Sequence, residues 1–222
     1  MAKKEKEVGT GPKTILVGVL HRDVISPNFF KSFLTFFVES AGKYSLQIST
    51  ADASFPEVAY NGLAEQMLNG KADYLLLVDA KLRLPPDLIQ RLEGHGKDIV
   101  AALHFDPKTL APMFRVDEKG KEVIPKEFKK GELLKASSVG MGCTLLSRKA
   151  FEKLQETQKD KPFFVLEMKN RREYRPSFLY FCNLAKKAGL DLFVDTGCIV
   201  GSGRSMTVQA QPGPRPPPTI SA

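Results

Sequence analysis

The sequence predicts an α/β fold, in which helices flank a mixed, mostly parallel sheet within a single domain. Apolar runs of strand length alternate along the chain with longer segments that carry helix-end signals. One run, residues 72–81, is apolar up to Asp79 and is soon followed by Pro85 and Pro86. With 222 residues, the chain is long enough to bury the core of one such domain.

The first half of the chain alternates strand and helix signals in order. Strands are predicted at residues 14–20, 46–50, 74–79 and 98–103. Helices are predicted between them at residues 27–43, 56–68 and 86–92. Pro56 suits the first turn of its helix, Asn69 and Gly70 suit its C-cap, and Gly94 closes the third helix. The alternation favours a mainly parallel sheet that is covered on both faces.

The first predicted helix is unusually rich in apolar side chains. We interpret them as core-packing residues rather than ligand contacts. They are Phe29, Phe30, Phe33, Leu34, Phe36, Phe37 and Val38.

The second half begins with a polar, lysine-rich stretch at residues 105–134, which predicts a hairpin or excursion at the open face of the sheet. An apolar segment with glycine hinges follows at residues 139–146. Ser147 is a suitable N-cap for a helix over 148–155. A last helix is predicted over 176–187, ending at Gly189, and a last strand over 192–195.

Both ends of the chain differ from this pattern. Residues 1–12 are charged and predict a flexible basic tail, and residues 207–222 are proline-rich and predict a disordered tail, which leaves a domain at 13–206. Proline-rich segments also dock on aromatic grooves as polyproline helices.

Charge and cysteine content narrow the classes of function and setting. The 33 Lys and Arg residues outnumber the 25 Asp and Glu residues and give a net charge of +8, which is compatible with nucleotides, nucleic acid or a membrane surface, and also with simple solubility. The 3 cysteines are far apart and form no Cys-x-x-Cys pair, so neither a zinc site nor a disulfide framework is predicted. A reducing, cytoplasmic setting follows, and no signal peptide or membrane-spanning run is visible.

Four segments together resemble the GT-A glycosyltransferase family, in the compact form found in bacterial and phage genomes. The likeness covers roughly residues 14–203, in the family's order, and includes a closing helix and strand around Phe181 and Val194. The four segments are residues 15–19, 72–89, 96–103 and 139–147. The resemblance implies a GT-A-like, Rossmann-related fold that transfers a sugar from a nucleotide-sugar donor to an acceptor hydroxyl.

The resemblance also implies a chemistry for the site. In the family, a divalent cation such as Mn²⁺ or Mg²⁺, held by an Asp-x-Asp motif, neutralises the diphosphate of the donor. A carboxylate at the start of the last helix deprotonates the acceptor hydroxyl in inverting members. A histidine after the last strand often completes the metal shell.

This chain departs from the family pattern at each of these places. Asp79 is kept, but Lys81 replaces the second acid, so that any cation is held weakly through Asp79. Ser177 and Phe178 stand where Glu-Asp is usual, and Ser202 stands in place of the histidine. A degenerate motif of this kind predicts either an unusual transferase or an inactive one.

Eight residues are the predicted site. Asp52, Asn61 and Asp79 are expected on the donor, and Lys81 or Arg204 is expected to supply the positive charge that the cation would supply. Glycine permits close backbone approach at the acceptor side. Glu173 is the acid nearest to the missing base. The substrate-binding set is therefore Asp52, Asn61, Asp79, Lys81, Gly140, Gly142 and Arg204, with Glu173 as the catalytic residue. Each also has a plain structural interpretation, such as a turn cap, a surface lysine or a tightly packed glycine.

The histidines are weaker signals. His21 could edge a nucleotide pocket, a His104–Asp106 metal pair is conceivable from the spacing, and His95 is expected to be exposed in a Gly-His-Gly turn. The alternative function is a catalytically inactive protein of the same fold that acts as a binding or scaffold module for an anionic partner. Nucleic acid is one such partner, although no groove-reading motif singles it out.

Overall fold

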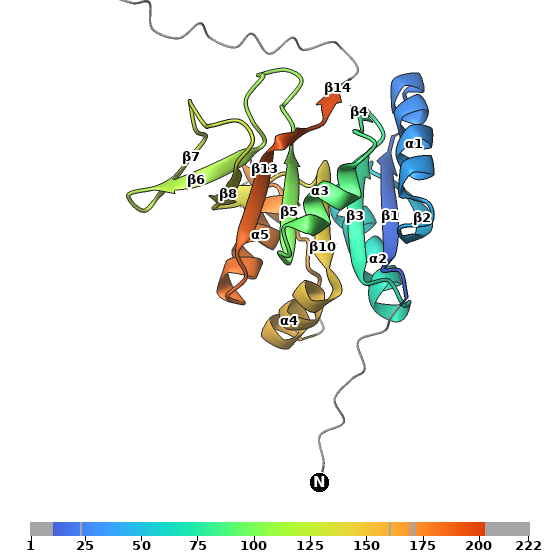
Figure 1. Cartoon of the computed structure of the whole chain (residues 1–222). Coiled ribbons are helices and arrows are strands. Elements are labelled where there is room, and N and C mark those ends of the chain that lie inside the picture. Colours follow the sequence, from blue (N-terminus) through green and yellow to red (C-terminus); the bar gives the residue numbers. More distant parts are fainter. Residues whose placement is uncertain (1–10, 23, 160, 169, 171, 203–222) are drawn as a thin grey trace, which may run out of the picture.

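The computed structural model describes residues 11–22, 24–159, 161–168, 170 and 172–202. A seven-stranded sheet forms its centre, with the strand order β2-β1-β3-β10-β5-β13-β8 (Figure 1). Five of these strands run in one direction, and β10 and β8 run against them. The bounds of the seven strands are β1 Thr14–His21, β2 Ser45–Asp52, β3 Tyr74–Asp79, β5 Ile99–Leu103, β8 Leu133–Ala136, β10 Cys143–Ser147 and β13 Leu192–Ile199.

In the described part of the chain, five helices cover the two faces of the sheet, so each face has its own apolar core. Helices α1 and α3 bury Phe29, Phe36, Leu88 and other side chains on one face, and α2, α4 and α5 bury Leu63, Phe151 and other side chains on the opposite face. The helices are α1 Pro27–Ser40, α2 Pro56–Asn69, α3 Leu88–Gly94, α4 Arg148–Gln158 and α5 Ser177–Lys187. This arrangement confirms the predicted fold class, a mixed and mostly parallel sheet flanked by helices.

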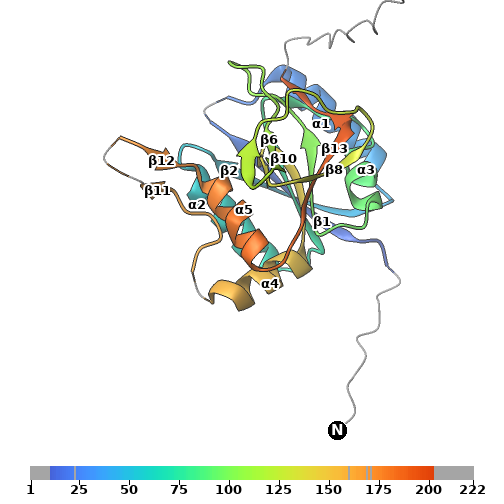
Figure 2. The same ribbon diagram turned by 90° about the vertical axis from the view of Figure 1, so that its left-hand side faces the viewer.

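Small ladders surround the main sheet. The polar stretch predicted as an excursion forms the β6–β7 hairpin, and β11 and β12 form a second hairpin beside α5 (Figure 2). The last described strand, β14, pairs with β4 just after Asp79. The bounds are β4 Leu82–Arg83, β6 Phe114–Glu118, β7 Lys121–Val123, β9 Ser138–Val139, β11 Glu167–Met168, β12 Tyr174–Arg175 and β14 Gly201–Ser202.

Local signals at the helix ends behave as predicted. Ser147 begins α4 as its N-cap, where its hydroxyl accepts the N–H of Ala150 at 3.0 Å and donates to Asp98 at 2.8 Å. Pro56 opens α2, and Gly70 is its C-cap. The predicted proline-rich tail and most of the N-terminal tail lie outside the described residues.

One prediction about the core is wrong in part. Phe29 and Phe36 of α1 are buried, but Phe30, Leu34, Phe37 and Val38 are 36–71% exposed. The helix is apolar on two faces, and the sheet can bury only one of them.

Candidate functional site

The carboxyl ends of the parallel strands gather polar side chains at one edge of the sheet. His21, Asp52 and Asp79 are the last residues of β1, β2 and β3, and His104 directly follows β5. Parallel strands that end at one edge place their terminal side chains in one region, which is where α/β sheets bind ligands. The order of these strands therefore assembles the candidate site.

Asp79 lies half-buried at the centre of this edge. Its N–H donates to the carbonyl of Gly142 at 2.7 Å, and its Oδ1 accepts the N–H of Lys81 at 2.9 Å. One carboxylate oxygen thus shapes the turn after β3. The other oxygen makes no hydrogen bond with the described residues.

His104 is the buried neighbour of Asp79. Its side chain lies against two glycines, because a Cβ on Gly142 would stand 2.9 Å from Nε2 and a Cβ on Gly140 would stand 3.0 Å from the same atom. The close approach predicted for Gly140 and Gly142 is therefore an approach to this imidazole. The sequence analysis gave His104 little weight and connected the two glycines with the acceptor side instead.

The protonation of His104 follows from its surroundings. Burial lowers the pKa of the imidazole from its usual value, against smaller opposing effects of the Ala102 carbonyl and of Asp79. Nδ1 lies 3.2 Å from the carbonyl oxygen of Ala102, and a carbonyl can only accept, so Nδ1 carries the proton. Neutral His104 then presents the lone pair of Nε2 toward Gly140 and Gly142.

The carboxylate of Asp106, which the sequence spacing offers as a metal partner of His104, is used in part by a local turn. Oδ1 of Asp106 accepts the N–H groups of Lys108 and Thr109 at 2.9 and 2.7 Å, which makes it the cap of a local turn. In the described part of the chain, no group of three or more His, Cys, Asp or Glu residues is placed to hold a metal ion.

Helix α2 contributes Tyr60 and Asn61. Burial, and then the charge of Asp79, raise the pKa of Tyr60 to about 12, so its hydroxyl stays protonated near Asp79. Asn61 donates to the carbonyls of Glu57 and Phe164 at 2.8 and 2.7 Å and accepts the N–H groups of Phe163 and Phe164 at 2.9 and 3.1 Å. All the hydrogen-bonding capacity of its amide is thus used, and Asn61 fastens the 163–164 segment to α2.

Asp52 lies at the outer end of the site. It is exposed, it pairs in register with His21, and its Oδ1 accepts the N–H and hydroxyl of Ser54 at 2.8 and 2.7 Å. These bonds, and to a lesser degree the charges of His21 and Arg22, lower the pKa of Asp52. The predicted donor residues Asp52 and Asp79 thus end two strands that flank β1 at the same edge of the sheet.

Lys81 is exposed beside Asp79 and has no ion-pair partner within the described ranges. The β14–β4 pairing sets the backbone of Ser202 opposite Leu82, three residues after Asp79. Arg204 lies outside the described residues.

The start of α5 carries no acid in its first turn, and Ser177, its first residue, is buried. Glu173 lies instead in the β11–β12 hairpin, which projects from the body of the domain (Figure 2). Its carboxylate accepts from Asn170 at 3.3 Å. The catalytic role of Glu173 stays a prediction.

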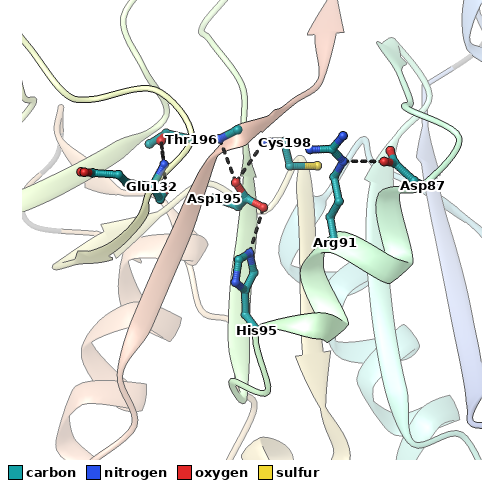
Figure 3. A network of polar contacts seen from close by, with 8 residues as sticks. Asp87, Arg91, His95, Glu132, Asp195, Thr196 and Cys198 are labelled. Atoms are coloured by element: carbon teal, nitrogen blue, oxygen red, sulfur yellow. Dashed lines mark hydrogen bonds and ion pairs between the residues drawn. The ribbon is translucent and has the colours of Figure 1, made fainter.

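Sequence reasoning missed a polar network between α3 and β13 (Figure 3). Nε2 of His95 lies 2.9 Å from Oδ2 of Asp195, and Oδ1 of Asp195 accepts the N–H groups of Gly197 and Cys198 at 2.8 and 3.0 Å. The expectation that His95 is merely exposed is wrong. The network holds a bulge where the register between β13 and β5 shifts.

No protein-family model matches the chain, and no curated protein matches it. Among solved structures, the chain is similar to the crystal structure of A197 from STIV, with a TM-score of 0.57 and 14% identity over 85% of this chain and 84% of that one. It is also similar to the crystal structure of GalNAc-T7 with UDP, GalNAc and Mn²⁺, with a TM-score of 0.47 and 11% identity over 90% of this chain but only 46% of that one. At these identities the first likeness is one of fold alone, and the second is too remote to support an argument. No helix in the described ranges has the length and apolar character needed to cross a membrane.

Proposed function

We propose that the carboxyl edge of the sheet binds a nucleotide sugar and transfers the sugar to an acceptor hydroxyl. The observation that carries this proposal is the setting of Asp79, which is half-buried at the end of β3 with one uncommitted oxygen, between Asp52 on one side and His104 on the other. Lys81, which has no ion-pair partner among the described residues, follows Asp79 two positions along the chain.

Each residue has a proposed role. Asp52 reads the nucleoside, Asp79 holds the ribose, and the ammonium of Lys81 lies against the diphosphate, where it stabilises the charge of the leaving group. Gly140 and Gly142, packed on His104, form the acceptor side. Asn61 has no role in substrate binding in this proposal, because all the donors and acceptors of its side-chain amide are bonded within the protein.

The donor set does not fit a preformed metal site. Asp79 has Lys81 where a second carboxylate would stand, and the described residues supply no third ligand beside Asp79 and His104. In the proposal, Lys81 therefore neutralises the charge of the diphosphate. Arg204, which is outside the described residues, stays a second source of positive charge in the proposal.

A thermal-shift screen of nucleotide sugars, with Mn²⁺ and with a chelator, tests this function. A ligand at about a hundred times its Kd adds about 2.7 kcal/mol, which corresponds to a rise in Tm of about 5–10 °C for a domain of this size. We expect the rise in chelator as well as in Mn²⁺.

A matched pair of variants locates the binding. Asp79→Asn keeps the acceptor for the Lys81 N–H but removes the charge, and we expect it to lose the shift. Asp191→Asn, at the other end of the sheet in an exposed pair with Lys135, is the control and should keep it. No shift with any donor in the wild-type protein, or an equal loss in both variants, would refute the assignment.

The second candidate is a catalytically inactive binding module of the same fold. The lack of an acid in the first turn of α5 favours it, since that is where the general base of inverting members lies. A nucleotide sugar that binds through Asp79 without turnover in any acceptor screen would support it. Duplex DNA whose binding falls steeply with salt would identify a nucleic-acid partner instead.

A further inference from the structure

His104 is a buried base to which the roles proposed above give no chemistry. The residue is 7% exposed, its Nδ1 is bonded to the Ala102 carbonyl, and its Nε2 has no hydrogen-bond partner among the described residues. In that part of the chain, the side-chain oxygens and nitrogens that are shielded from solvent without a partner are the hydroxyls of Ser40 and Ser137. Because Nε2 is not one of them, the described residues leave an approach to its lone pair.

Two glycines leave space next to that lone pair. Gly140 and Gly142 lie between β9 and β10, and a Cβ would stand 3.0 Å from Nε2 on the first and 2.9 Å from Nε2 on the second. Neither glycine has a positive φ, so the backbone there does not itself require glycine. The space beside the imidazole does, because a side chain at either position would cover the lone pair.

The surroundings keep the imidazole neutral. Burial lowers the pKa of His104, against the smaller effects of the Ala102 carbonyl and of the charge of Asp79. Met113 and Leu82 border the two glycines and carry no charge. Since Nδ1 donates its proton to a carbonyl, Nε2 is a proton acceptor at neutral pH.

Gly142 connects His104 with the proposed donor site. Its carbonyl accepts the N–H of Asp79 at 2.7 Å, while a side chain on it would meet Nε2 of His104. In the sheet, β10 separates β3, which ends at Asp79, from β5, which ends just before His104. A hydroxyl bound at Nε2 therefore lies across one strand from a sugar held at Asp79.

We propose that His104 is the general base of the transfer, and that its Nε2 takes the proton of the acceptor hydroxyl. The proposal rests on the proposed function, and it supplies the base that the first turn of α5 lacks. The O–H bond of the acceptor breaks as its oxygen bonds to the anomeric carbon of the donor. The bond from that carbon to the diphosphate breaks, and its electron pair leaves with the nucleoside diphosphate beside Lys81. The imidazolium, which the charge of Asp79 stabilises, then gives its proton to water.

The release of nucleoside diphosphate measures the transfer, with UDP-glucose, UDP-N-acetylglucosamine and GDP-mannose as donors and methyl glycosides as acceptors. We expect His104→Gln to lower kcat about 100-fold, the lower end of what a positioned base contributes. The rise in Tm with the donor and the KM for the donor should stay unchanged. A fall in donor affinity that accounts for the lost rate would give His104 a binding role and overturn the proposal.

The pH profile separates a base from a merely structural histidine. Because the pKa of His104 is lowered from 6.5, the wild-type rate should be level above pH 6.5 and fall below it. The residual rate of His104→Gln should lack that fall. The same fall in both proteins, or its loss in Glu173→Gln instead, would overturn the assignment.

A second variant covers Nε2 and leaves the imidazole in place, which keeps the test open if His104→Gln does not fold. Gly140→Ala puts a methyl group 3.0 Å from Nε2, and it should lower kcat at least about tenfold while the donor still raises Tm. Gly62→Ala, whose Cβ meets nothing within 4 Å, is the matched control and should transfer at the wild-type rate. Equal rates in the two alanine variants would refute the contact.

Two results separate this proposal from the proposed function. If a donor stabilises the wild-type protein but no nucleoside diphosphate is released with any acceptor, the binding site stands and the role of His104 is overturned. If no donor stabilises the protein, the proposed function itself is refuted, and the base with it.

Discussion

Replacing Gly142 by alanine tests the packing on which the candidate site depends. The new Cβ would stand 2.9 Å from Nε2 of His104, 3.3 Å from its Cδ2 and 3.5 Å from Leu82. The imidazole cannot simply swing aside, because Nδ1 is bonded to the Ala102 carbonyl and the ring also packs near Gly140, where a Cβ would stand 3.0 Å from Nε2. The φ of Gly142 is not positive, so the cost comes from contact and not from backbone strain.

Overpacking of this kind costs about 1–3 kcal/mol, which corresponds to a fall in Tm of about 2–12 °C for a domain of this size. Gly142 also accepts the N–H of Asp79, so a shifted backbone should weaken nucleotide-sugar binding beyond its effect on stability. Differential scanning calorimetry gives the first quantity, and ligand titration at a temperature well below Tm gives the second.

Gly62→Ala is the matched control. This glycine lies within α2, and a Cβ there meets nothing within 4 Å. The substitution should stabilise the protein by about 0.5–1 kcal/mol, because alanine loses less conformational freedom in a helix.

A double-mutant cycle with His104→Ala identifies the contact. If the imidazole is the obstacle, Gly142→Ala should cost nothing in the His104→Ala background. Strict additivity of the two substitutions, or a Gly142→Ala protein as stable as the wild type, would refute the reasoning.

Three further substitutions test the frame around the site. Arg148→Ala should lower the free energy of unfolding, measured in urea, by about 2–4 kcal/mol. The guanidinium of Arg148 caps α2 by donating to the carbonyls of residues 67, 68, 70 and 72. Lys149→Ala, at the exposed neighbouring position, is the control and should leave the stability unchanged. Asn61→Ala should lower the free energy of unfolding by about 2–4 kcal/mol, because the N–H groups of residues 163 and 164 lose their acceptor. A variant as stable as the wild type would contradict the structural role of Asn61. Because burial lowers the pKa of His104 in the folded protein, the unfolded chain takes up the proton first as pH falls below 6.5. Stability should be complete above pH 6.5 and decline below it, and His104→Asn should flatten that decline in urea midpoints measured at several pH values.

Much of the fold was predictable because its signals are local. The apolar run that ends at Asp79 and the helix starts at Ser147 and Pro56 depend on residues close in sequence. The direction of β10, which runs antiparallel between β3 and β5, has no such local signal. The same holds for β8, a short edge strand at the end of a lysine-rich stretch.

The strand-end positions of Asp52 and Asp79 were predictable from the sequence, but the contacts of the other candidate residues were not. Strand order placed Asp52 and Asp79 at one edge, as the sequence suggested. Asn61 instead bonds to Phe164, 103 residues further along the chain, and no pattern near Asn61 could show this contact. His95 is likewise paired with Asp195 across 100 residues. Side chains whose roles depend on distant partners are the ones that the sequence alone leaves open.

The bulge in β13 connects the His95–Asp195 pair with the loop that follows Asp79. Residues 196–198 have no partner in β5, and after them the chain turns toward β4 and the loop behind Asp79. The carboxylate of Asp195 supplies the acceptor that the ladder lacks there, and His95 fixes that carboxylate from α3. Random mutagenesis selected for lost binding should therefore also return substitutions at His95 and Asp195, although neither side chain would touch the bound molecule.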